Sequence, residues 1–135
     1  MKYEDIKRDF LFEQIENYDY VSLTETVCDS VQTYYDLTGF DYIAWNEMED
    51  DEKATYIRLT KWILDNEVDY YEFHDEWVNS MRSHKWKYFD DEEYNKYRKW
   101  DYRLTSIDNL NYEGKSFSRL YVSLVYALKE LFQEY

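Results

Sequence analysis

The sequence predicts a single, mostly α-helical domain with short extended segments between its helices. Proline is absent and glycine occurs only at Gly39 and Gly114, so the chain has few of the residues that build the tight turns of a strand-rich fold. Apolar residues recur at helical spacing over several long segments. A chain of 135 residues has the length of one domain that buries a core without disulfides or a metal ion. We therefore expect one compact domain covering residues 1–135.

The first part of the chain contains two predicted helices and an aromatic connection. Residues 3–16 are expected to form a short charged helix, and residues 22–38 a longer one with apolar residues at helical spacing. Gly39 follows the second helix as its C-terminal stop, because glycine readily adopts the left-handed conformation found there. Residues 40–48 are apolar and aromatic, and we expect them to cross the core in extended form.

Two further helices are predicted at residues 50–65 and 68–83. The first opens on Asp50 and Asp51, whose negative charges suit the positive end of the helix dipole. The second has an apolar stripe that predicts its buried face. That stripe consists of Tyr70, Phe73, Trp77 and Met81.

The last third of the chain contains the clearest helical pattern. Residues 90–100 are predicted to form a short helix after Asp90, and residues 101–110 an extended connection. The final helix begins after Asn111, a plausible N-cap residue. Its apolar stripe, which we expect to face the core, consists of Phe117, Leu120, Leu124, Leu128 and Leu131.

A spacing that occurs twice predicts an internal repeat. Met48 lies five residues before Lys53, and Leu110 lies five residues before Lys115, each pair next to the start of a long helix. If this spacing reflects a repeat, each half of the chain contains a helix, an aromatic segment and a second helix, in that order. The predicted pseudo-repeats, both within the one domain, cover residues of about 20–66 and 67–135.

The charge of the chain is strongly negative and unevenly distributed. The formal net charge is −14. Residues 1–80 hold 21 acidic and 6 basic side chains, whereas residues 81–104 hold 7 basic and 5 acidic ones. A negative field of this size repels nucleic acids and anionic membranes and attracts basic proteins. We therefore expect a basic protein partner, with no direct binding of nucleic acid and no membrane contact.

The sequence places the protein in a reducing cytoplasm. Its first residues mix charges without the apolar run of a signal peptide. No stretch approaches the roughly 18 apolar residues of a membrane span. The single cysteine, Cys28, excludes an intramolecular disulfide.

Enzymatic and metal chemistry find little support in the sequence. Cys28 lies on the apolar side of its predicted helix, as an unreactive buried cysteine does. His74 and His84 are ten residues apart and lack the partners of a zinc site. Two glycines cannot supply a phosphate-binding loop. We therefore expect a non-enzymatic protein without a cofactor or a metal ion.

The second half of the chain carries several motifs in a defined order. A helix with a histidine and a tryptophan precedes an aromatic element, a lysine, a polar connection and a basic start to the final helix. The residues are His74, Glu76-Trp77, Trp86-Lys87-Tyr88, Lys99, Asp101, Arg103-Leu104, Ile107-Asp108-Asn109-Leu110, Lys115 and Arg119. This series resembles the RyR domain, the repeat named for ryanodine receptors. Trp45-Asn46-Glu47-Met48 and Lys53 resemble it more loosely in the first half.

The resemblance implies a pair of helical repeats with a non-catalytic binding role. Some RyR repeats are linked to purine nucleotides, and related short proteins are common in bacteriophage genomes, so it also implies a phage origin and action in a host bacterium. Asp101-Tyr102 stands where the family has His-Pro, and His84-Lys85 replaces the glycine of its Gly-Trp element. Both departures fall near the family's ligand site.

The acidic residues of the middle of the chain form the first candidate site. A rigid array of carboxylates can occupy a basic groove in place of nucleic-acid phosphates and release the counterions held there. The leading hypothesis is an inhibitor of a host defence component, such as a CRISPR effector or another nuclease; plain solubility is the simpler explanation. The candidate residues are Glu47, Glu49, Asp50, Asp51, Glu52, Asp69, Glu72, Asp75 and Glu76.

A segment that interleaves cations with aromatic rings forms the second candidate site. Rings can stack on a base while cations hold its phosphate, so the alternative function is to bind or sequester a purine or cyclic nucleotide that serves as an immune signal. The simpler explanation is that these cations neutralise the acidic half within the fold. The candidate residues are Trp86, Lys87, Tyr88, Tyr97, Arg98, Trp100 and Arg103. A third hypothesis is a cellular protein-interaction module.

Overall fold

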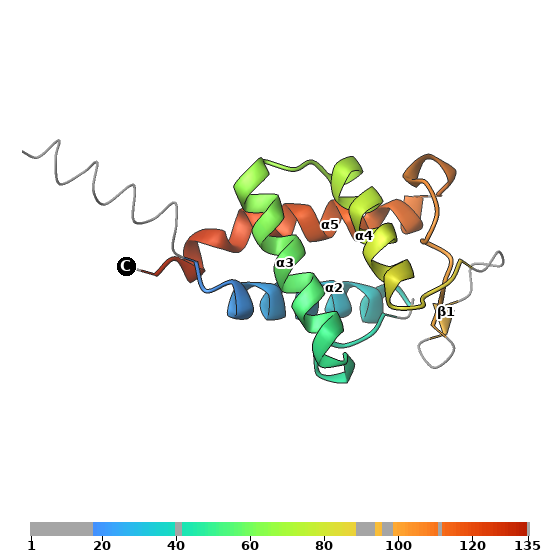
Figure 1. The fold of residues 1–135 in the computed structure, drawn as a ribbon, viewed down its shortest axis with the longest axis horizontal. Helices are drawn as coiled ribbons and strands as arrows, with labels where there is room; N and C mark the ends of the chain where they lie inside the picture. Colours follow the sequence, from blue (N-terminus) through green and yellow to red (C-terminus); the bar gives the residue numbers. More distant parts are fainter. Residues whose placement is uncertain (1–17, 40–41, 89–93, 96–98, 111, 135) are drawn as a thin grey trace, which may run out of the picture.

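Four packed helices make up the domain in the computed structural model (Figure 1). The structure describes residues 18–39, 42–88, 94–95, 99–110 and 112–134. The helices are α2 (Tyr20–Thr38), α3 (Asp50–Asn66), α4 (Tyr70–Ser83) and α5 (Tyr112–Leu128). Short 3-10 turns, η1 (Trp45–Glu47), η2 (Ile107–Asn109) and η3 (Lys129–Phe132), lie between or after them. The helix predicted at residues 3–16 and the cap predicted at Asn111 lie outside the described residues.

The helices pack in two directions around one core. α2 and α5 run in opposite directions along the long axis of the domain, and α3 and α4 cross over them (Figure 1). α5 contacts all three other helices. The side chains on the inward face of α5 therefore pack against all three other helices and supply a large part of the core.

Three helix ends, two in α2 and one in α4, follow from local capping interactions. The Asp19 side chain accepts a hydrogen bond from the Ser22 N–H, so α2 begins two residues before the predicted start. Gly39, with a φ of 79°, ends α2 as predicted. Asp69 caps α4 by accepting from the Glu72 N–H at 2.9 Å, which explains why that helix begins at Tyr70 and not at Val68. The helices predicted at 22–38, 50–65 and 68–83 are thereby confirmed, with small shifts of their ends.

The buried face of α5 differs from the predicted one. Phe117, Tyr121 and Val125 are fully buried, whereas the exposed fraction of Leu131 is 75%. Leu120, Leu124 and Leu128 lie only half-buried along the edge of this face. Of the predicted stripe, Phe117 is confirmed as a core residue and Leu131 is wrong, because the centre of the buried face runs through Tyr121 and Val125, one position after Leu120 and Leu124.

Tyr121 can be buried because the core contains hydrogen-bond partners for its hydroxyl group. Its oxygen lies 2.9 Å from Thr60 Oγ1, to which Thr24 also donates a hydrogen bond. Tyr56, whose ring centre lies 5.9 Å from that of Tyr121, accepts a hydrogen bond at its hydroxyl oxygen from the Trp77 indole N–H at 3.0 Å. These pairings join α2, α3, α4 and α5 and satisfy polar atoms that would otherwise be costly to bury.

The helix predicted at residues 90–100 is wrong where the structure describes this region. β1 (Tyr94–Asn95) and β2 (Trp100–Asp101) pair as a two-residue antiparallel ladder. Lys87 continues this pairing, since its N–H donates to the Lys99 carbonyl and its own carbonyl accepts from the Asp101 N–H. Hydrogen bonds from a residue a dozen positions away therefore decide this conformation, and no local pattern shows them.

The two segments predicted as extended connections are so only in part. Residues 42–44 have no regular structure, and Trp45–Glu47 then forms the turn η1. The second connection contains β2 and then the turn η2.

No helix in the described part of the chain is long and apolar enough to cross a membrane. The division into two pseudo-repeats stays a prediction.

Candidate functional site

Exposed carboxylates gather in two groups at opposite ends of α3, and six of the nine predicted acidic residues belong to these groups. The helix spans 17 residues, so its ends lie about 24 Å apart at a rise of about 1.5 Å per residue. We call the exposed carboxylates near its start the amino-end cluster: Glu47, Glu49, Asp50 and Asp51. We call the exposed carboxylates around its end the turn cluster: Asp65, Glu67, Asp69 and Glu72.

The surface between these two clusters is not uniformly acidic. Arg58 and Lys61 are exposed on the middle of α3. The Arg58 guanidinium lies 3.6 Å from the carboxylate of Glu76, which is one of the predicted site residues and is half-buried. Asp75, another predicted residue, is exposed on α4. The acidic surface is therefore two separate clusters rather than one continuous face.

Glu52 does not belong to the exposed acidic surface. Its exposed fraction is 3%, and its carboxylate lies 3.7 Å from the Lys99 ammonium. Burial raises the pKa of the Glu52 carboxyl, and the positive charge of Lys99 opposes that rise. The prediction that Glu52 contacts a partner is corrected, because the side chain turns inward from the first turn of α3 and pairs within the fold.

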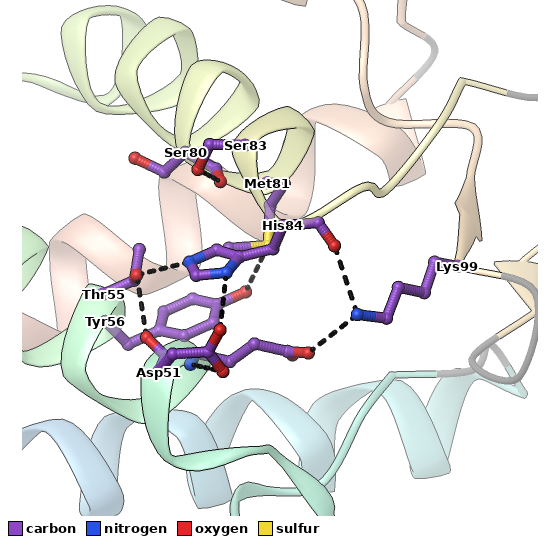
Figure 2. A network of polar contacts seen from close by, with 9 residues as sticks. Asp51, Thr55, Tyr56, Ser80, Met81, Ser83, His84 and Lys99 are labelled. Atoms are coloured by element: carbon purple, nitrogen blue, oxygen red, sulfur yellow. Dashed lines mark hydrogen bonds and ion pairs between the residues drawn. The ribbon is translucent and has the colours of Figure 1, made fainter.

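A polar network ties the amino end of α3 to the end of α4 (Figure 2). His84 Nδ1 lies 3.2 Å from the Asp51 carboxylate, and His84 Nε2 lies 2.7 Å from Thr55 Oγ1. The Lys99 ammonium donates to the His84 carbonyl at 3.2 Å. Two carboxylates near the amino end therefore pair with side chains of the basic segment, by which we mean residues 81–104. Asp51 pairs with His84, and Glu52 pairs with Lys99.

The order Asp51, His84, Thr55 resembles the carboxylate, imidazole and hydroxyl of a proton relay. The Thr55 hydroxyl also donates to the Asp51 carbonyl of its own helix at 3.0 Å. Both ring nitrogens of His84 therefore have a polar partner, one on each side of the ring. We interpret this arrangement as a clamp between α3 and α4.

The described residues of the basic-aromatic segment are partly buried and partly exposed. Trp86 has an exposed fraction of 4% and Arg103 of 2%, so neither presents a surface to a nucleotide. Lys87 and Tyr88 are exposed. Tyr97, Arg98 and the side chain of Trp100 lie outside the described residues. The predicted roles of Trp86 as a stacking platform and of Arg103 as a phosphate partner are corrected by their burial.

Arg103 is an internal cation of the core. Its Nε donates to the Asp101 carboxylate at 2.8 Å, and a second guanidinium nitrogen contacts the other carboxylate oxygen. Aromatic rings surround the guanidinium, with ring centres 4.9 to 5.7 Å from its carbon: Tyr35, Tyr42, Trp77 and Phe117. A paired cation held by carboxylate and rings tolerates this burial. Arg103 thereby attaches the segment after β2 to three helices.

The turn cluster borders a groove, which we call the turn groove. It lies between the turn joining α3 to α4 and the C-terminal half of α5, and its volume is about 1080 Å³. Three rings and three carboxylates line it: Tyr18, Tyr70, Tyr126, Asp65, Glu67 and Asp69. Leu64, Val68 and Val122 supply apolar surface. A groove of this size can hold several residues of a peptide.

Tyr126 holds the wall of the turn groove in place. Its hydroxyl lies 3.2 Å from the Ile63 carbonyl and 3.0 Å from the Val68 carbonyl, to which it donates. Burial raises the pKa of the Tyr126 hydroxyl, and the carboxylates of Glu67, Glu72 and Asp69 raise it further. The negative charges of the turn cluster therefore act on groups that line the groove.

Sequence reasoning missed four of the residues that form this groove: Tyr18, Asp65, Glu67 and Tyr126. A signal for two of them was present, because carboxylates at the end of a helix oppose its dipole. Asp65 lies in the last turn of α3 and Glu67 is its C-cap residue, with a φ of 50°. For Tyr18 and Tyr126, which come from distant parts of the chain, no sequence signal exists.

The remaining chemically reactive side chains have structural surroundings. His74 is buried between the Ser118 hydroxyl at 2.7 Å and the Thr105 carbonyl at 2.8 Å, and burial lowers its pKa. Burial raises the pKa of the Cys28 thiol to about 12, so little thiolate forms near neutral pH. The described residues contain no group of three or more side chains placed to hold a metal ion.

No family model, curated protein or solved structure matches this chain. The resemblance to RyR domains stays a prediction. The candidate site therefore depends on the geometry and charge described above.

Proposed function

We propose that this chain is a non-enzymatic, acidic binding protein that occupies the nucleic-acid-binding surface of a basic partner protein. The observation that carries the proposal is the turn cluster. Among the described residues, none of its four carboxylates takes part in an ion pair. A net charge of −14 would steer the chain to such a partner over long range.

The position of the turn cluster argues against solubility as its only role. Asp65 and Glu67 lie at the negative end of α3, which has no basic residue in its last turn. Each carboxylate in such a position costs about 0.3–1 kcal/mol. Carboxylates placed anywhere else on the surface would serve solubility without that cost, so a binding role accounts better for their location.

A protein that normally holds nucleic acid is the partner class that this charge pattern fits. Its basic groove carries counterions or phosphates, and their release favours binding of an acidic surface. A defence nuclease such as a CRISPR effector belongs to this class. A phage-encoded inhibitor acting in the host cytoplasm is the biological setting we propose, in line with the RyR-like motifs.

Displacement of nucleic acid from purified partners tests this proposal. A panel of CRISPR effectors and other bacterial nucleases would be loaded with fluorescent DNA or RNA and titrated with the chain at two salt concentrations. We expect the chain to displace the nucleic acid from at least one member, and less effectively at high salt because screening weakens every charge pair.

Two charge reversals of equal size separate the clusters. Asp65→Lys with Glu67→Lys should slow association about tenfold, since the reversed charges oppose steering at the contact itself. Glu49→Lys with Asp50→Lys is the matched control, and these side chains are also exposed. Nucleic acid that stays bound to every panel member in a ternary complex, at either salt concentration, would contradict the proposal.

A further inference from the structure

The turn groove combines negative charge with aromatic and apolar surface. Its carboxylates belong to Asp65, Glu67 and Asp69, and its rings include Tyr18 and Tyr126. The chain's own cations already lie against rings of this groove. The Lys129 ammonium is 5.9 Å from the centre of the Tyr126 ring, and the Arg119 guanidinium is 5.1 Å from that of Tyr70. Two of the three rings of the groove therefore lie beside a cation, and one of these cations, Lys129, itself lines the groove.

A guanidinium fits this combination better than an ammonium does. It is planar, forms two parallel hydrogen bonds with a carboxylate and is less strongly hydrated, so it stacks on rings at a lower desolvation cost. Its three-carbon stem can cover apolar surface such as that of Leu64 and Val122. The Arg103 site has the same combination of groups within this protein, with a guanidinium between a carboxylate and several rings.

We infer that the turn groove is the anchoring site for an arginine side chain of the partner protein. The guanidinium lies among the carboxylates of the groove, and its stem lies on the apolar surface. This inference rests on the proposed function and names the chemistry of its main contact. The amino-end cluster then contributes to long-range attraction and not to the anchor.

Calorimetry with three matched peptides tests this inference. The probe is a ten-residue glycine–serine peptide with three arginines, compared with the same peptide carrying three lysines or three citrullines. Citrulline keeps the shape of arginine and removes its charge. We expect the arginine peptide to bind most tightly, the lysine peptide more weakly, and the citrulline peptide at least about tenfold more weakly than the arginine peptide.

Neutral variants localise the binding. Asp65→Asn with Glu67→Gln should weaken the arginine peptide about tenfold, whereas Glu49→Gln with Asp50→Asn should weaken it less than about twofold. Both pairs remove two negative charges from exposed positions, and circular dichroism would verify that each variant keeps its helices. Equal losses in both variants, equal binding of citrulline, or no binding of the arginine peptide would overturn the inference.

The outcome is separable from that of the proposed function. Arginine-specific peptide binding without displacement of nucleic acid from any partner would retain the groove site and reject the function. Displacement that is unaffected by Asp65→Asn with Glu67→Gln would retain the function and reject the groove as the anchor.

Discussion

The two ends of α3 carry similar numbers of carboxylates and use them differently. At the amino end, Asp51 and Glu52 pair with His84 and Lys99, which join the helix to the basic segment. At the carboxyl end, the turn cluster forms no ion pair among the described residues and surrounds a groove. The comparison shows that net charge does not locate a binding surface, because the fold neutralises some of its carboxylates and exposes others.

The helix dipole makes this difference more informative. Carboxylates at the amino end are stabilised by the positive end of the helix, whereas those at the carboxyl end are opposed by its negative end. Asp50 and Asp51 therefore help to form α3, while Asp65 and Glu67 weaken it. Stability accounts for the first cluster, and binding accounts better for the second.

The largest expected effect is in the core that both ends share. Phe117 is fully buried, so Phe117→Ala should cost about 3–5 kcal/mol of unfolding free energy. Leu124→Ala, at the half-buried edge of α5, should cost only about 1–2 kcal/mol. Denaturant titration measures both. A larger loss for Leu124→Ala than for Phe117→Ala would mean that Leu124 is buried more deeply than its half-buried position in the structure indicates.

A smaller effect is expected at the amino end of α3. Lys99→Met leaves the Glu52 carboxylate buried without its cation, whereas Lys99 itself is 30% exposed and can be hydrated. The substitution should cost about 2–3 kcal/mol at neutral pH, below the full penalty for breaking a buried pair because of that exposure. Replacing both partners, with Glu52→Gln added, should restore much of the stability. A double variant as unstable as Lys99→Met would show that the ion pair is not the cause.

The same variant has a predictable dependence on pH. Because burial raises the pKa of Glu52 in the folded state, its contribution to stability is greatest below the unfolded pKa and is lost as the pH rises through the folded pKa. Without Lys99, the pKa of Glu52 rises further. The cost of Lys99→Met should therefore be smaller at about pH 4 than at about pH 7. A cost that is the same at both pH values would contradict this role for Glu52.

The smallest of these effects is expected at the carboxyl end of α3. Tyr126→Phe removes the hydroxyl that donates to the Ile63 and Val68 carbonyls, and it should cost about 1 kcal/mol, the usual net worth of such a hydrogen bond. Hydrogen exchange of the backbone between α3 and α4 should increase, and binding of the arginine peptide should weaken. A variant that loses several kilocalories would mean that this end is as strongly tied to the core as the amino end.

Much of the fold could be predicted because its signals are local. Helical spacing located α2, α3 and α4 to within about two residues, the usual uncertainty of a helix end, and Gly39 marked the end of α2. The caps at Asp19 and Asp69, which set the starts of α2 and α4, were not predicted. The face of α5 could not be predicted in the same way. Its leucines and its aromatic residues lie one position apart, and only the packing of three other helices chose between them.

The candidate site shows the same division more sharply. The sequence predicted that Glu52 faces a partner and did not single out Asp65, yet Glu52 is buried and Asp65 borders a groove. Trp86 and Arg103 were predicted to line a ligand pocket at the surface, but both side chains are buried. A charged side chain is predicted to be exposed unless its partner is known, and the partners here are distant in sequence.

The sequence by itself determined the helical composition of this protein, the approximate positions of three helices and the size and sign of its charge. These properties depend on residue types and on contacts within one helical turn. The tertiary structure alone decided which carboxylates are neutralised, where Arg103 and Glu52 are buried, and that Tyr18, the end of α3 and Tyr126 meet at one groove. Those outcomes depend on contacts between segments up to about a hundred residues apart, whose free energy no local pattern contains.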